Sequence, residues 1–187
     1  MNNTFYFLRH EETKRDSIIP ISQWVLSEKG QEQAKILAQQ KMFDDIKIIC
    51  SSTEKKAYQT AKPIADKFKK EVIKIDEIGE LNRDNGGFME PEEYEQAVKY
   101  CLENLNKSVS NWETATHALE RFSNKIEEID KQYENEKILV VGHGFTLNLY
   151  FAKLLDALDT VYERFNTNNY GDWGIVKEGK VIKDIAK

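Results

Sequence analysis

Two histidines and two basic residues come just after short apolar runs of this sequence. Arg9 and His10 directly follow the first such run, Lys56 comes shortly after the second, and His143 follows a later, strongly apolar one. A neutral imidazole can act as a nucleophile or a general base, and Arg and Lys bind oxyanions through charge-assisted hydrogen bonds. If the four side chains meet, they form an oxyanion site, and phosphate fits such a site.

The elements that must position these side chains alternate along the chain. Apolar runs at 5–8, 46–50, 72–75 and 138–141 indicate strands, and residues 173–176 and 180–185 predict a closing hairpin. Amphipathic stripes predict helices within 27–41, 57–68, 91–105 and 113–133 and a helix over 144–155; Pro63 is expected to kink or restart the second. Strands alternating with helices indicate an α/β fold, a three-layer α/β/α sandwich on a mostly parallel sheet.

In open α/β sheets, ligands bind beyond the carboxyl ends of the strands, so we expect the two histidines and two cations at one edge. The turn Gly142-His143-Gly144 ends one predicted strand and begins a predicted helix. A dinucleotide fingerprint would need glycine where Leu147 stands, and a nucleophile elbow would need serine where His143 stands. What remains is a histidine on a tight turn whose small neighbours allow a ligand to approach closely. His117, on a predicted helix among polar neighbours, is assigned no role.

Composition narrows the class of protein. The chain has 187 residues, which predicts a single domain over 1–187. It carries 27 Lys and Arg against 32 Asp and Glu, a formal net charge of −5, which argues against nucleic acid or an anionic membrane as a partner.

The two cysteines, Cys50 and Cys101, match no disulfide framework or metal spacing. With no signal-peptide pattern and no apolar run long enough to span a bilayer, we expect a soluble, cytoplasmic protein.

Taken together, the strand-end segments resemble the histidine phosphatase superfamily, also called phosphoglycerate mutase-like. In the family's order, the resemblance rests on Leu8-Arg9-His10 with Glu12-Thr13, residues 26–34, residues 51–61 with Lys56, Ile78-Gly79-Glu80 with Arg83, and residues 140–144. It runs from about residue 4 to residue 155. There are departures: Glu11 stands where the family has glycine after the histidine, and Lys56 stands where it has arginine. Lys keeps the charge but loses the planar bidentate fork.

The resemblance implies a transient phosphohistidine on His10, and the chemistry of the residues supports it. Arg9, Lys56 and His143 would hold the non-bridging oxygens of the phosphoryl group. Glu80 would protonate the leaving oxygen and later activate water. Glu11, Arg83 and Gly144 are possible additional site residues, Glu11 as an alternative proton donor.

The sequence therefore predicts a phosphomonoesterase that acts on a small phosphate ester without a metal or cofactor. Two alternatives stay open: a phosphoglycerate mutase, and a catalytically weakened module that binds phosphorylated ligands. Residues 84–112 are expected to form a lid that sets specificity, with Phe88, Met89, Tyr94 and Trp112 as candidate wall residues. The substrate's identity and the oligomeric state are left open.

Overall fold

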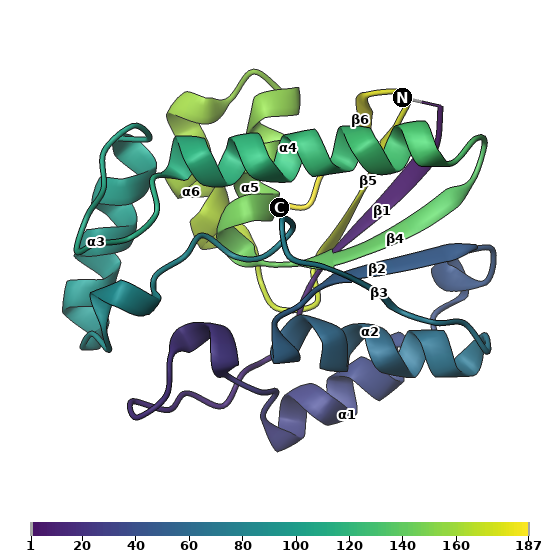
Figure 1. The fold of residues 1–187 in the computed structure, drawn as a ribbon, viewed down its shortest axis with the longest axis horizontal. Coiled ribbons are helices and arrows are strands. Elements are labelled where there is room, and N and C mark those ends of the chain that lie inside the picture. Colours follow the sequence, from purple (N-terminus) through teal and green to yellow (C-terminus); the bar gives the residue numbers. More distant parts are fainter. Residues whose placement is uncertain (1, 187) are drawn as a thin grey trace.

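The computed structural model describes residues 2–186, and their strands form one twisted sheet (Figure 1). The strands lie in the order β3-β2-β4-β1-β5-β6. β3, β2, β4 and β1 run parallel, and β5 is antiparallel to both β1 and β6. Their bounds are β1 (Thr4–Arg9), β2 (Ile48–Ser52), β3 (Ile73–Ile75), β4 (Lys137–Gly142), β5 (Trp173–Lys177) and β6 (Lys180–Lys183). The prediction of a mostly parallel sheet with a closing hairpin is confirmed.

The apolar character of β4 follows from its burial on both faces. Ile138 and Val140 pack into one hydrophobic cluster, whereas Leu139 and Val141 pack into another on the opposite face. This alternation is the two-residue period of a strand, applied to a strand that has no solvent-facing side. A continuous apolar run therefore marks the centre of the sheet.

Helices cover both faces of the sheet, giving three layers (Figure 1). α1 (Glu28–Leu37) and α2 (Lys55–Lys67) contribute to the cluster on one face. The other face is covered by α3 (Pro91–Glu103), α4 (Ala115–Gln132), α5 (Gly144–Leu154) and α6 (Val161–Thr167). The short helix α6 was not expected from the sequence. The three-layer α/β/α arrangement is confirmed.

Pro63 neither ends nor restarts α2, which is continuous from residue 55 to 67. A proline inside a helix removes one backbone hydrogen bond. Here Ala61, Ile64 and Ala65 are completely buried against the sheet, and such packing, more than propensity, supplies most helix stability in proteins. The expectation of a restart at Pro63 is therefore wrong.

The parallel strands bring their carboxyl ends to one edge. Arg9 pairs with Gly142 at the ends of β1 and β4, and Ser51 near the end of β2 pairs with Val141. The segments that follow β1, β2 and β4 therefore start side by side.

None of the helices within residues 2–186 combines the length and apolarity needed to cross a bilayer. Both cysteines are buried free thiols.

Candidate active site

His10 is the first residue beyond β1, and its backbone and ring are both fixed. Its N–H donates to the carbonyl of Gly142 at 3.0 Å, which ties it to the end of β4. Its Nδ1 lies 2.7 Å from the carbonyl oxygen of Glu11. Because a carbonyl oxygen only accepts, Nδ1 carries the proton in this hydrogen bond. The lone pair of the neutral ring is thus on Nε2.

The surroundings keep this imidazole neutral. Burial lowers the pKa of His10 well below its ordinary value of 6.5, and the neighbouring His143, Lys56 and Arg9 lower it further. The backbone hydrogen bond to Glu11 acts in the opposite direction but does not outweigh them. At neutral pH His10 is therefore an unprotonated base with one nitrogen available.

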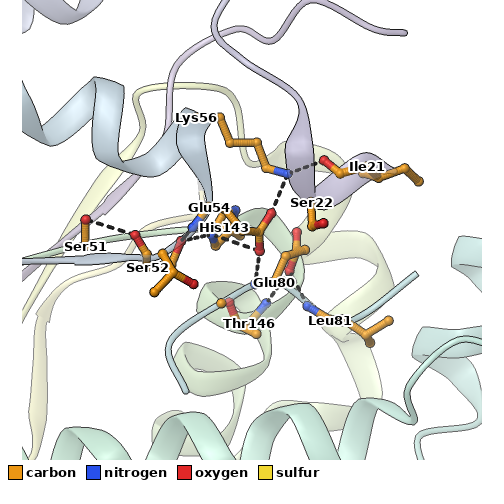
Figure 2. Close-up of polar contacts among 12 residues, drawn as sticks. Ile21, Ser22, Ser51, Ser52, Glu54, Lys56, Glu80, Leu81, His143 and Thr146 are labelled. Carbon is orange, nitrogen blue, oxygen red and sulfur yellow. Dashed lines mark hydrogen bonds and ion pairs between the residues drawn. The ribbon is translucent and has the colours of Figure 1, made fainter. Parts of the chain in front are cut away.

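His143 lies beside His10 at the start of α5. The two ring centroids are 5.1 Å apart, and His143 is completely buried. Its Nε2 is 2.6 Å from Oγ of Ser52, at the end of β2 (Figure 2). Its Nδ1 is buried without a hydrogen-bond partner among the described residues. Burial, followed by the charges of Lys56 and Arg83, lowers the pKa of His143 well below 6.5.

Lys56 reaches the site from the first turn of α2 and is also buried. Its Nζ donates to the carbonyl of Ile21 at 2.9 Å and forms an ion pair with Oε2 of Glu54 at 2.5 Å. The other carboxylate oxygen of Glu54 is 3.4 Å from Nε2 of His143 and accepts from the backbone N–H of Glu80 at 2.7 Å. Figure 2 shows Glu54 between Lys56 and His143.

Glu54 was missed by the sequence analysis. Its position, two residues before Lys56 and just after β2, is the signal that could have placed it at this edge. A carboxylate is not an expected member of an oxyanion site, so residue type argued against it.

Arg9 is oriented by the segment before β5. Its Nη1 donates to the backbone carbonyl of Asn168 at 2.5 Å and to the side-chain oxygen of the same residue at 3.1 Å. The guanidinium carbon lies 4.8 Å from the ring centre of Tyr170. Gly144 matters here, because a Cβ at that position would lie 3.2 Å from the Arg9 guanidinium and 3.1 Å from the ring of Phe165. Asn168 and Tyr170 were not identified from the sequence.

Glu80 is held at the N-terminus of α5. Its Oε1 accepts from the backbone N–H groups of Leu81, Phe145 and Thr146, at 3.0, 3.1 and 3.2 Å. The first N–H groups of a helix have no partner within the helix, and this carboxylate satisfies two of them. Because α5 begins next to His143, these bonds fix Glu80 close to the two histidines.

Glu11 is placed differently. Its side chain is buried but packs against Gly171, whose φ of +73° and lack of a Cβ leave room for the carboxylate. Burial, followed by the charges of Asp172 and Glu12, raises the pKa of Glu11 to about 7. Glu11 thus contributes its backbone carbonyl to His10, whereas its carboxyl group faces the turn at 170–172.

A cavity of about 220 Å³ brings most of the sequence-derived candidates together. Glu11 and His143 are not among the side chains that line it. Its polar lining includes Arg9, His10, Arg15, Lys56, Glu80, Arg83 and Glu90, and its apolar walls include Trp24, Phe88, Met89, Tyr94, Trp112, Phe145, Phe165 and Tyr170. The four wall residues expected from the segment 84–112 are among them.

The arrangement suits the transfer of a phosphoryl group. It offers a neutral imidazole with a free Nε2, cationic donors beside it, and a carboxylate on the same cavity wall. Within residues 2–186, no group of three or more His, Cys, Asp or Glu side chains is placed to hold a metal ion.

Comparison with known proteins gives an independent line of evidence. A family model described as "Histidine phosphatase superfamily (branch 1)" matches residues 5–177. Phosphoserine phosphatase 1 of Hydrogenobacter thermophilus is 30% identical over 149 residues, which covers 77% of this chain and 71% of that protein.

Solved structures share the fold. A mutant phosphoserine phosphatase from Entamoeba histolytica, in complex with phosphoserine, superposes with a TM-score of 0.79 at 22% identity, covering 97% of this chain and 94% of that one. A mycobacterial glucosyl-3-phosphoglycerate phosphatase in complex with VO₃ gives 0.81 at 17% identity, covering 98% and 99%. YhfR of Bacillus stearothermophilus gives 0.79 at 21%, covering 97% and 95%.

Proposed function

The chain belongs to the histidine phosphatase superfamily and is a phosphomonoesterase, and we propose that it hydrolyses a small phosphate ester through a phosphohistidine on His10. The observation that carries this proposal is the hydrogen bond from Nδ1 of His10 to the carbonyl of Glu11. It leaves Nε2 unprotonated in a ring that burial keeps neutral. Such a nitrogen is ready to attack phosphorus without first losing a proton.

In the first step, Nε2 of His10 forms a bond to phosphorus while the bond from phosphorus to the ester oxygen breaks. The leaving oxygen takes a proton from the carboxyl group of Glu80, which lines the same cavity as His10. In the second step, water attacks the phosphohistidine, and Glu80 takes a proton from that water. Orthophosphate leaves, and both His10 and Glu80 return to their starting states.

Arg9, Lys56 and His143 would hold the non-bridging oxygens during both steps. Lys56 has three N–H donors, of which one is directed to Ile21 and one to Glu54, so one remains for phosphate. If Ser52 donates its hydroxyl proton to Nε2 of His143, the proton of that ring is on Nδ1, which has no partner among the described residues. The hydrogen bonds strengthen as charge spreads over the transferring phosphoryl group.

The remaining expectations belong to the same proposal. We take the 187 residues as one histidine phosphatase-like domain that works in the cytoplasm on a small phosphorylated substrate, with no need of a metal or cofactor. Support for a reducing compartment comes from the two buried free thiols. Support for a small substrate comes from the size of the cavity.

One observation favours a second candidate, a weakened module that binds phosphorylated ligands. The Glu54 carboxylate already forms an ion pair with Lys56. Its negative charge beside Lys56 repels an incoming phosphate. Such a module would bind orthophosphate without forming a phosphohistidine.

A panel of phosphate esters and 3-phosphoglycerate, assayed for released phosphate and for isomerised product, tests the proposal. We expect phosphate release that survives thorough chelation. Isomerised product without phosphate release would indicate a mutase, and binding without turnover would indicate the module. Loss of activity on chelation with rescue by one metal would contradict the proposed chemistry.

A further inference from the structure

The loop that carries Glu80 is held from outside by one arginine. Residues 76–83 follow β3 and belong to no helix or strand. Arg121, on α4, donates from Nη1 to the backbone carbonyls of Glu77 and Gly79, at 2.8 and 3.0 Å. Its Nη2 donates to the backbone carbonyl of Glu80 at 2.7 Å. One guanidinium therefore binds the loop at three carbonyl groups, and one of them belongs to the candidate proton donor itself.

Glu113 fixes the direction of this guanidinium. Its carboxylate accepts from Nε and Nη2 of Arg121, both at 2.8 Å, in the bidentate geometry that suits this pair of side chains. Glu113 is also joined to the loop itself. Its Oε2 accepts from the backbone N–H of Asn82 at 2.9 Å, and its own N–H donates to the carbonyl of Asn82 at 2.8 Å. Arg121 and Glu113 thus anchor the loop on both sides of Glu80.

The backbone of Glu80 is restrained at both of its peptide groups. Its N–H donates to Oε1 of Glu54 at 2.7 Å, and its carbonyl accepts from Arg121. From this position its carboxylate reaches the N-terminus of α5. Arg121 does not line the cavity that contains His10, so it is not placed to touch the substrate. An effect of Arg121 on the reaction must therefore pass through the loop.

We propose that Arg121 is a positioning residue for proton transfer, which keeps the carboxyl group of Glu80 within hydrogen-bond reach of the leaving oxygen. This rests on the proposed function, which assigns that proton transfer to Glu80. A general acid must lie within hydrogen-bond distance of the oxygen that it protonates, and a displacement of about 1 Å can cost about 100-fold in rate. Because the loop belongs to no helix or strand, contacts with other elements must supply that precision.

The dependence on the leaving group distinguishes positioning from a general structural role. Arg121→Met removes the hydrogen bonds and keeps an unbranched side chain. In single-turnover measurements it should slow an alkyl phosphate by about 10- to 100-fold, and p-nitrophenyl phosphate by about threefold or less. Adding Arg121→Met to Glu80→Gln should change little, because the proton donor is already gone. Arg121→Lys, which keeps the charge without the planar fork, should fall between wild type and Arg121→Met.

Lys125→Met is the matched control. Lys125 lies one turn further along α4 and is equally shielded, with 21% of its side chain exposed against 20% for Arg121. It pairs with the carboxylates of Glu77 and Glu128 rather than with the backbone of the loop. Its loss should leave both rates unchanged. Equal losses for both substrates in Arg121→Met, or no loss for either, would overturn the proposal.

Hydrogen exchange tests the anchoring of the loop without turnover. In Arg121→Met the backbone amides of Glu80 and Asn82, which donate to Glu54 and Glu113, should exchange faster than in wild type, whereas those of β4 should not. Arg121→Lys is read in the same assay if Arg121→Met does not fold.

The two measurements separate this inference from the proposed reaction. If Glu80→Gln shows no dependence on the leaving group but Arg121→Met releases the loop amides, the role of Glu80 in the reaction fails while the anchoring of its loop stands. If Glu80→Gln shows that dependence and Arg121→Met neither shows it nor releases the amides, the positioning role fails and the proposed reaction stands.

Discussion

Glu54 and Lys56 form an ion pair inside the proposed oxyanion site, with Oε2 of the carboxylate 2.5 Å from Nζ of the lysine. The pair is largely buried, since the side chains are 12% and 3% exposed. A phosphoryl group that approaches Lys56 therefore meets a neighbouring negative charge, and the two anions compete for one cation.

Neutralising Glu54 should strengthen the binding of phosphate. In Glu54→Gln the amide oxygen can still accept from the backbone of Glu80, but the negative charge is gone. We expect the Kd for orthophosphate to fall by about tenfold, because like charges a few ångströms apart in a partly buried site repel strongly. Calorimetric titration measures this. Glu77→Gln, which removes an exposed carboxylate paired with Lys125, is the control and should leave Kd unchanged.

Removing Lys56 should weaken catalysis. Lys56→Ala removes one charge-assisted hydrogen-bond donor from the transition state. The loss of transition-state stabilisation, calculated from the ratio of kcat/KM values, should be on the order of 2–4 kcal/mol. Part of that loss arises because Glu54 is left without its cation, so Glu54→Gln combined with Lys56→Ala should recover some activity. Strict additivity of the two changes would contradict their coupling, and an inconsequential Lys56→Ala would exclude the side chain from the site. Lys56→Arg should keep or raise activity.

The proton donor can be identified from the leaving group. An alkyl phosphate leaves as a strongly basic alkoxide and needs a proton, whereas p-nitrophenyl phosphate leaves as a stable phenolate. In single-turnover measurements, Glu80→Gln should slow the reaction of alkyl phosphates by roughly 10²–10⁴-fold, with a much smaller effect on the aryl ester.

Glu11→Gln should change both substrates alike, because the carboxyl group of Glu11 packs against Gly171 and does not line the cavity. If the loss of rate depends on the leaving group in Glu11→Gln but not in Glu80→Gln, then Glu11, and not Glu80, is the proton donor.

Glu11 should also make stability depend on pH. Its pKa is raised to about 7 in the folded protein, so the folded state holds this proton more tightly than the unfolded state, whose Glu has a pKa near 4.5. This contribution is fully present below about pH 4.5 and is lost as the pH rises through about 7. Between pH 5 and pH 8, wild type should therefore lose on the order of 2 kcal/mol that Glu11→Gln keeps.

Urea unfolding at the two pH values measures that difference. Glu77→Gln is the matched control, because hydrogen bonds from its own backbone N–H and from Lys125 lower the pKa of the exposed Glu77, and Glu77 is not among the charges that shift the pKa of Glu11. It should keep the wild-type loss between pH 5 and pH 8. Equal pH dependence of Glu11→Gln and wild type would show that Glu11 ionises freely in the folded protein.

The sequence was enough to bring His10, His143 and Arg9 to one edge of the sheet, because Arg9 ends a buried strand and His10 and His143 each directly follow one. A strand that is buried on both faces has a continuous apolar sequence, which can be recognised without a structure. The carboxyl ends of parallel strands lie at the same edge of the sheet. Lys56 was found for a related reason, since it lies in the first turn of the helix after β2.

Other features depend on contacts between distant segments that no local pattern records. The partners of Arg9 at Asn168 and Tyr170 lie about 160 residues away in the chain and follow the unexpected helix α6. The direction of the Glu11 side chain is set by the space above Gly171. The course of α2 through Pro63 likewise depends on packing against the sheet.

The phosphoenzyme itself provides the decisive measurement. Wild-type enzyme should be mixed with a phosphate ester that it hydrolyses, quenched in alkali during turnover, and digested for mass spectrometry. We predict an acid-labile, alkali-stable phosphate on His10, absent from His10→Ala, together with loss of turnover in that variant and severe loss in His143→Ala. Normal turnover by folded His10→Ala, or a phosphate trapped on a different residue, would contradict the role of His10 as nucleophile.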